Sequence, residues 1–191
     1  MNAEDRIALE AKRAEIEYRR SLSRESSIKD AISRQGSNHN PRSYDDTPVG
    51  TFHSADKIFL RWVEPDLFEY MPRQPENFSF ERSSGDVITP TRMFTDGGSI
   101  PRAGWVLADF SPWNYVPAFI VHDWEFDAHH CEVSEKTFDE VSATMMEGVK
   151  TLMETGVCEK SIFAFNAIQA GISSFIGRRS WERRVDVCPL P

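Results

Sequence analysis

Aromatic residues are distributed so unevenly that only part of this chain can build a core. All five tryptophans and all thirteen phenylalanines lie after Gln35. The first 35 residues carry 8 basic and 7 acidic side chains, whereas the rest of the chain carries 14 basic and 23 acidic ones. Because a stable core needs apolar side chains in quantity, we expect one folded body preceded by a segment of a different kind.

The first segment is predicted to be helical. Residues 1–20 are rich in Ala, Glu, Arg and Lys, which are strong helix formers. Their apolar side chains Ile7, Ala11, Ala14 and Tyr18 recur at helical spacing, so we expect them to share one face. So thin a stripe fits either a solvated arm or an arm that docks against a partner subunit.

The rest of the chain favours a single α+β domain. We therefore divide the sequence into a helical docking arm (residues 1–35), a linker rich in turn formers (36–50) and one α+β domain (51–191). Short strand candidates with connections too short for crossover helices predict a small, mostly antiparallel sheet. These candidates are residues 57–63, 67–71, 77–81 and 86–89, and the helix candidates that follow are residues 112–130, 134–154 and 159–176.

Composition excludes several classes of protein. The net charge of -8 argues against a surface that binds nucleic acid broadly, and the basic cluster at residues 178–184 is typical of a solvated helix end. No run approaches the roughly 18 apolar residues of a membrane-spanning helix, so no membrane span is expected. The three cysteines, Cys131, Cys158 and Cys188, are far apart in the sequence. We therefore expect neither a disulfide framework nor a cysteine-built zinc site, and we expect the protein to reside in a reducing compartment.

One segment that could carry chemistry is the loop FTDGGSIPR, residues 94–102. Its paired glycines, Gly97 and Gly98, permit positive φ and leave the backbone open to a ligand. Backbone N–H groups in such a loop can hold an anion, and its carbonyls can hold a cation. We take Gly97, Gly98 and Arg102 as candidate ligand-binding residues; the alternative is a tight turn that leaves the sheet.

The second segment contains His122 and Asp123, in the middle of an otherwise apolar helix candidate. Ionisable groups cost free energy there unless they find partners, so we expect the two to share a function. Neighbours on a helix point in different directions, and we therefore expect another carboxylate to orient His122. Asp139 is the first candidate, if the next helix packs antiparallel, and Asp96 is the second. Ser99 is a candidate nucleophile, although the G-x-S-x-G elbow is absent.

The same segment offers two sets of possible metal ligands on two helix faces. One set is Asp123, Asp127 and His130, and the other is His122, Glu125 and His129. Neither matches H-E-x-x-H, the spacing of zinc proteases. For Asp127, His129 and His130 we favour an exposed helix end, where the negative end of the helix dipole suits imidazoles.

These motifs together resemble an uncharacterised domain family common in tailed bacteriophages and prophages. The resemblance rests on FTDGGSIPR, on the HDW of residues 122–124 and on Phe138-Asp139, and it covers roughly residues 50–180. It implies a virion or assembly protein, such as a neck, tail or ejected component. Such a protein would be an oligomer located in the virion or host cytoplasm, and would bind other virion or assembly proteins through its N-terminal arm.

The layout is also similar to that of secreted phospholipases A2. That similarity implies that Gly97, Gly98 and Asp123 hold a divalent cation such as calcium, that His122 activates water, and that Asp139 orients His122. The chain lacks the paired cysteines of those enzymes. The alternative function is a hydrolase that uses the His-Asp site and acts on lipid, peptidoglycan or a small ester or amide.

Overall fold

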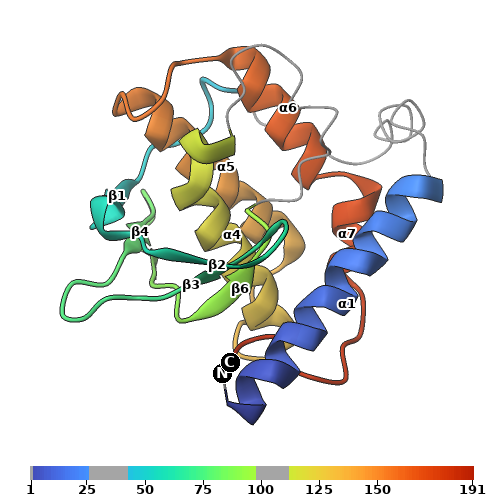
Figure 1. The fold of residues 1–191 in the computed structure, drawn as a ribbon. Helices are drawn as coiled ribbons and strands as arrows, with labels where there is room; N and C mark the ends of the chain where they lie inside the picture. Colours follow the sequence, from blue (N-terminus) through green and yellow to red (C-terminus); the bar gives the residue numbers. More distant parts are fainter. Residues whose placement is uncertain (1, 26–42, 98–111) are drawn as a thin grey trace.

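The predicted α+β class is confirmed by the computed structural model, which describes residues 2–25, 43–97 and 112–191. A long helix comes first, short strands follow, and further helices complete the chain (Figure 1). No helix in the described part of the chain has the length and apolar character that crossing a bilayer requires.

The strands form two small antiparallel sheets where the sequence predicts one. The first sheet has the order β1-β4-β5 and the second the order β2-β3-β6. The strands are β1 (Thr51–His53), β2 (Leu60–Glu64), β3 (Leu67–Tyr70), β4 (Ser79–Glu81), β5 (Val87–Ile88) and β6 (Met93–Thr95), and a 3-10 turn, η2 (Ala55–Lys57), follows β1. β1 and β6 lie outside the predicted strands, because three residues are too few to show an alternating pattern.

The second half of the chain is helical. Its elements are η3 (Pro112–Tyr115), α4 (Val116–His130), α5 (Phe138–Glu154), α6 (Ile162–Ile172) and α7 (Phe175–Trp181). Helix α5 begins later than expected because Thr137 and Glu140 form a capping box, in which each side chain bonds the backbone N–H of the other. The last expected helix is divided in two because the Ser174 hydroxyl caps α7.

Helix α4 lies at the centre of the fold. On one side it packs against α5 and α6 through an apolar cluster that includes Phe119, Met145 and Phe165. Gly148 of α5 allows this close approach, since a Cβ at that position would lie 3.2 Å from the side chains of Ala118 and Phe52. On its other side α4 faces the N-terminal helix α1 (Ala3–Glu25).

Helix α1 packs against its own chain, beside β6 and α7 (Figure 1). Its apolar side chains Leu9 and Ile16 belong to a cluster with Leu67 and Phe94 of the second sheet. The apolar face predicted from the sequence is not the one that packs against the body, because Ile7 is 51% exposed. The buried face lies next to the predicted one, and it carries charged residues as well as apolar ones.

A disulfide joins Cys131, the residue that follows α4, to Cys188 near the C-terminus. This disulfide differs from the prediction, because 57 residues separate the two cysteines and no spacing motif marks them. Cys158 is free and buried. The bridge fixes the C-terminal segment to the end of α4, close to the place where α7 packs against the same helix.

Candidate functional site

A set of charged side chains is enclosed between α1, α4 and the end of β6. We call it the buried charged cluster. Its members are Lys12, Glu15 and Arg19 of α1, Asp96 after β6, and His122, Asp123, Asp127 and His130 of α4. Ionised groups lose hydration when they are buried, so such a cluster must satisfy its charges internally.

Lys12 is the cation that joins the two helices. Its Nζ lies 2.8 Å from Oδ1 of Asp127 and 3.2 Å from Oε2 of Glu15, and the side chain is only 1% exposed. Burial lowers the pKa of Lys12, but the negative charges of Asp127 and Glu15 outweigh that effect and raise it above its ordinary value. Lys12 therefore stays charged inside the protein.

Arg19 extends the same network towards β6. Its guanidinium lies 3.3 Å from Oε1 of Glu15 and 3.5 Å from Oδ2 of Asp96. Asp96, a predicted orienting residue for His122, is thus an ion-pair partner of α1. Burial raises the pKa of Glu15, but the positive charges of Lys12 and Arg19 have the larger combined effect and leave the pKa below its ordinary value. Glu15 therefore remains ionised.

Asp127 is different from the other carboxylates because it has the least access to water. Its side chain is fully buried, and this burial, with added repulsion from Glu15 and Asp123, raises its pKa to about 7 although Lys12 acts in the opposite direction. The expectation of an exposed helix end is therefore wrong for Asp127. It is wrong because α1 and the chain around α7 cover this end of α4.

The two histidines at the end of α4 are also covered. The ring of His129 stacks on Trp181 with 3.8 Å between centroids. Nε2 of His130 lies 3.1 Å from the backbone oxygen of Ser180. Burial lowers the pKa of both histidines. As predicted, Asp127 and His130 share a face, and their ligand atoms lie close together.

Within the cluster, His122 and Asp123 contact each other. Nδ1 of His122 is 3.5 Å from Oδ1 of Asp123. The sequence analysis looks for a carboxylate on another element to orient His122, and in the structure the adjacent Asp123 already lies within ion-pair distance of the ring. Burial raises the pKa of Asp123, but His122 and the charges of Lys12 and Arg19 hold it below its ordinary range.

Thr95 at the end of β6 fixes the other oxygen of Asp123. The Thr95 hydroxyl donates a 2.6 Å hydrogen bond to Oδ2 of Asp123 and accepts a 3.0 Å bond from the N–H of Gly97. Gly97 has a φ of 75°, a conformation that favours glycine. The first half of the predicted loop therefore supports the His-Asp pair through Thr95.

The imidazole of His122 has one nitrogen without a hydrogen-bond partner in the part of the chain that the structure describes. Its ring packs on Phe126 at 4.7 Å, and its side chain is 13% exposed. Nε2 is buried and meets no hydrogen-bond partner among the described residues. An imidazole with one nitrogen near a carboxylate and the other free is suited to accept a proton.

A small cavity of about 40 Å³ lies beside Thr95. Its walls are mainly apolar and its polar lining comes from the start of the predicted loop. The lining residues are Leu60, Phe68, Thr95, Asp96, Gly97, Trp113, Val116, Phe119 and Ile120. The cavity can accept a small apolar group, and Thr95 connects it to Asp123.

The remaining predicted site residues do not all converge. Asp139 lies at the start of α5, is 56% exposed and pairs with Arg178 at 2.9 Å. Its neighbour Phe138 contacts Phe126, one helical turn beyond His122. Gly98, Ser99 and Arg102 lie outside the described residues, so their predicted roles stay predictions.

Sequence reasoning missed the contribution of α1. Lys12, Glu15 and Arg19 recur at spacings of three and four residues, which places them on one helix face beside Leu9 and Ile16. That charged stripe was the available signal. It could not identify the partners, because Asp127 of α4 and Asp96 after β6 are far from α1 in the sequence.

Comparison with known protein families gives a match to part of the chain. Residues 72–156 match the family described as "Protein of unknown function (DUF1353)". The matched stretch contains Thr95, His122, Asp123 and Asp139, and it ends before α6 without including α1. No curated protein and no solved structure matches the chain.

Proposed function

We propose that this protein is a hydrolase in which His122 is the general base. The observation that carries this proposal is the buried imidazole whose Nδ1 faces Asp123 and whose Nε2 has no partner among the described residues. Nε2 takes a proton from water while the water oxygen attacks the carbonyl carbon of an ester or amide. The ester C–O or amide C–N bond then breaks, and the imidazolium gives the proton to the leaving alcohol or amine. The substrate class is a lipid, peptidoglycan or a small ester or amide.

Asp123 and Thr95 give His122 its chemistry in this proposal. Asp123 stays ionised, because its pKa lies below the ordinary range, and it stabilises the imidazolium that forms when His122 takes the proton. The Thr95 hydroxyl prevents Asp123 from rotating away. The apolar cavity beside Asp96 and Gly97 receives part of the substrate.

Activity assays on the purified full-length chain test this proposal. The panel contains p-nitrophenyl esters, phospholipid vesicles and purified peptidoglycan. We expect His122→Ala to abolish hydrolysis and to leave the thermal midpoint of unfolding nearly unchanged. The matched control is His53→Ala, since His53 is about half exposed and pairs with Glu81 at the surface. Equal activity in the parent and His122→Ala, or a parent that hydrolyses nothing in the panel, would reject the proposal.

We also propose that the protein is a virion-associated or assembly protein. The observation that favours this second function is an exposed aromatic surface formed by Trp62, Phe68 and Trp113. Trp62 and Trp113 are 67% and 61% exposed, and each ring lies 5.6 Å from that of Phe68. Exposed clustered aromatics are typical of protein–protein contacts. The resemblance to phage proteins supports the same function, and a virion enzyme would satisfy both proposals.

Two measurements test the assembly function. Mass spectrometry of purified virions from a phage that encodes this chain should detect the protein in a fixed ratio to the tail or neck proteins. Light scattering of the purified chain should show an oligomer that Trp62→Ala weakens. A protein absent from virions and monomeric in solution would contradict this function and leave the hydrolase proposal untouched.

A further inference from the structure

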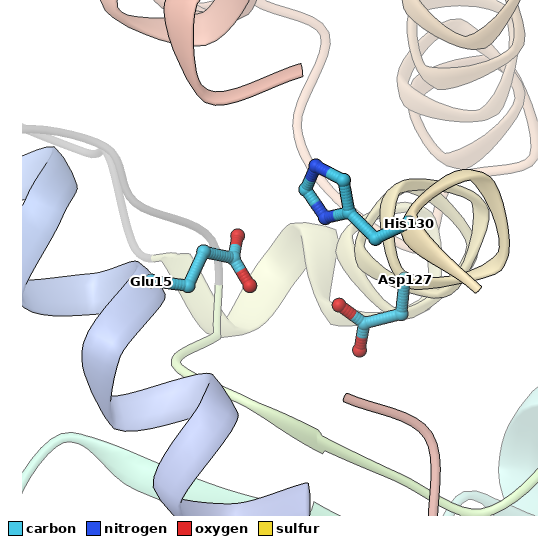
Figure 2. Close-up of side chains that lie close together, drawn as sticks. All are labelled: Glu15, Asp127 and His130. Atoms are coloured by element: carbon cyan, nitrogen blue, oxygen red, sulfur yellow. The ribbon is translucent and has the colours of Figure 1, made fainter. Parts of the chain in front are cut away.

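We propose that Glu15, Asp127 and His130 form a binding site for a first-row divalent transition metal ion. Figure 2 shows the three side chains turned towards a common centre between α1 and α4. One ligand atom from each of the three lies within 4.8 Å of the others. Metal–ligand bonds of about 2.0–2.2 Å place ligand atoms roughly 3–4 Å apart, so only a small contraction is needed.

His130 has the arrangement of a metal-binding histidine. Its Nε2 lies 3.1 Å from the backbone oxygen of Ser180, an interaction in which Nε2 carries the proton. Nδ1 then holds a lone pair, and it has no hydrogen-bond partner among the described residues. Histidine ligands commonly donate their second N–H to a backbone carbonyl, which fixes the tautomer and the ring. Figure 2 shows a ring nitrogen of His130 directed at the two carboxylates.

The two carboxylates also keep oxygens available. Oδ2 of Asp127 is buried and accepts no hydrogen bond from the described residues, while Oδ1 is held by Lys12. Oε2 of Glu15 lies 3.2 Å from Lys12 Nζ, but the described residues donate no hydrogen bond to it. A buried oxygen without a donor is costly, and a metal ion would satisfy both carboxylates.

The charge of the surroundings favours a cation. The buried charged cluster contains four carboxyl groups, from Glu15, Asp96, Asp123 and Asp127, against two basic side chains, Lys12 and Arg19. A divalent ion offsets the acidic excess at the point where the burial is deepest. His130 is partly buried, whereas Glu15 and Asp127 are buried.

The donor set indicates the class of metal. One imidazole nitrogen with two carboxylate oxygens suits Zn²⁺, Mn²⁺, Fe²⁺ or Co²⁺, whereas Ca²⁺ and Mg²⁺ prefer oxygen ligands alone. Three protein ligands also leave at least one position for water. This site is separate from the His122–Asp123 pair and does not depend on the proposed hydrolase activity.

Lys12 becomes an outer partner of the metal ligands in this proposal. Its Nζ stays on Oδ1 of Asp127 while the metal takes Oδ2, so one carboxylate serves both cations. Two neighbouring positive charges repel each other, and Lys12 must therefore weaken metal binding. If Lys12 only completed an ion-pair network and no metal site were present, replacing Lys12 would not change how the protein responds to metal ions.

Isothermal titration calorimetry of the chelator-treated full-length chain, with ZnCl₂ and with MnCl₂, tests the site. We expect one ion per chain for at least one of the two metals. Asp127→Asn and His130→Gln should weaken this binding by about 100-fold, because losing a ligand costs at least as much as losing its outer support. Asp139→Asn and His53→Gln, which change exposed groups of the same types, should leave the affinity unchanged.

A second measurement keeps the test decisive if Asp127→Asn does not fold. The metal should raise the thermal midpoint of Lys12→Met by more than it raises that of the parent, because the ion replaces the lost cation and binds without its repulsion. No binding of either metal, or binding that His130→Gln leaves intact, overturns the proposal. A midpoint of Lys12→Met that neither metal raises overturns it as well.

Discussion

Helix α4 packs in two opposite ways on its two sides. Towards α5 it presents Ala118 and Phe119 to an apolar cluster that contains Met145 and Val149. Towards α1 it presents Asp123, Asp127 and His130 to charged side chains, as the buried charged cluster. Apolar burial contributes favourably in proportion to the area removed from water, whereas a buried ion pair roughly balances its own desolvation. The apolar side accounts for the fold, and the charged side requires another reason for its presence.

The charged side is also held differently. Apolar contacts of Leu9 and Ile16 with the second sheet supply the attraction between α1 and the body. The disulfide at Cys131 and the stacking of Trp181 on His129 close the same end of α4. These contacts offset the free-energy cost of burying charged side chains. Buried ionisable groups that other contacts stabilise are expected where a protein uses such groups for chemistry or metal binding.

A single substitution on the charged side should lower the free energy of unfolding the most. Lys12→Met removes the cation between Asp127 and Glu15, and we expect it to cost about 3–5 kcal/mol because a carboxylate is left buried without a partner. Urea unfolding in the presence of a chelator measures this. The double variant Lys12→Met with Asp127→Leu should recover most of the loss. A double variant as unstable as the single one would mean that the ion pair itself, and not its imbalance, stabilises the protein.

A substitution on the apolar side should lower the free energy of unfolding slightly less. No second substitution can restore the loss there, because no charge is left without a partner. Met145 is 1% exposed within the apolar cluster. We expect Met145→Ala to lower the free energy of unfolding by about 2–4 kcal/mol through lost transfer energy and a residual cavity. The same urea titration measures it. A loss below 1 kcal/mol would show that the neighbouring helices collapse into the space.

The apolar side was predictable from sequence, and the charged side was not. Helical spacing alone predicts a buried stripe for the helix candidate 134–154, and each of its members is at most 3% exposed: Phe138, Val141, Met145, Val149 and Leu152. Periodicity succeeds there because local sequence and burial agree. It fails for α1, whose buried face includes Lys12 and Glu15, because a charge pattern indicates a solvated face unless its partner is known.

The candidate site was predictable only in part for a related reason. His122 and Asp123 were singled out because ionisable groups in an apolar helix need partners. Their actual neighbours, Thr95 on β6 and the α1 side chains, are fixed by tertiary packing that no local spacing encodes. The cysteine pair was missed for the same reason, since its two members are 57 residues apart and are brought together by tertiary packing.

The disulfide gives a third test, of how the charged side is held closed. Cys188→Ser opens a link between residues 57 apart, and we expect it to cost about 2–4 kcal/mol, because the unfolded chain gains freedom. Thermal unfolding with and without dithiothreitol measures the effect. The reductant should lower the midpoint of the parent to that of Cys188→Ser and leave the variant unchanged. A parent that does not respond to the reductant would contradict the link.

The smallest effect is expected at Asp139, which distinguishes a surface ion pair from an active carboxylate. Asp139 and Arg178 are both about half exposed, and such pairs contribute only about 0–1 kcal/mol. We expect Asp139→Asn to change stability by no more than this and to leave hydrolysis unchanged, whereas Asp123→Asn should reduce hydrolysis strongly because it removes the charge beside Nδ1 of His122. Activity assays on the two matched variants measure the contrast. If Asp139→Asn loses as much activity as Asp123→Asn, the exposed carboxylate must reach His122 during turnover, and the orienting role returns to Asp139.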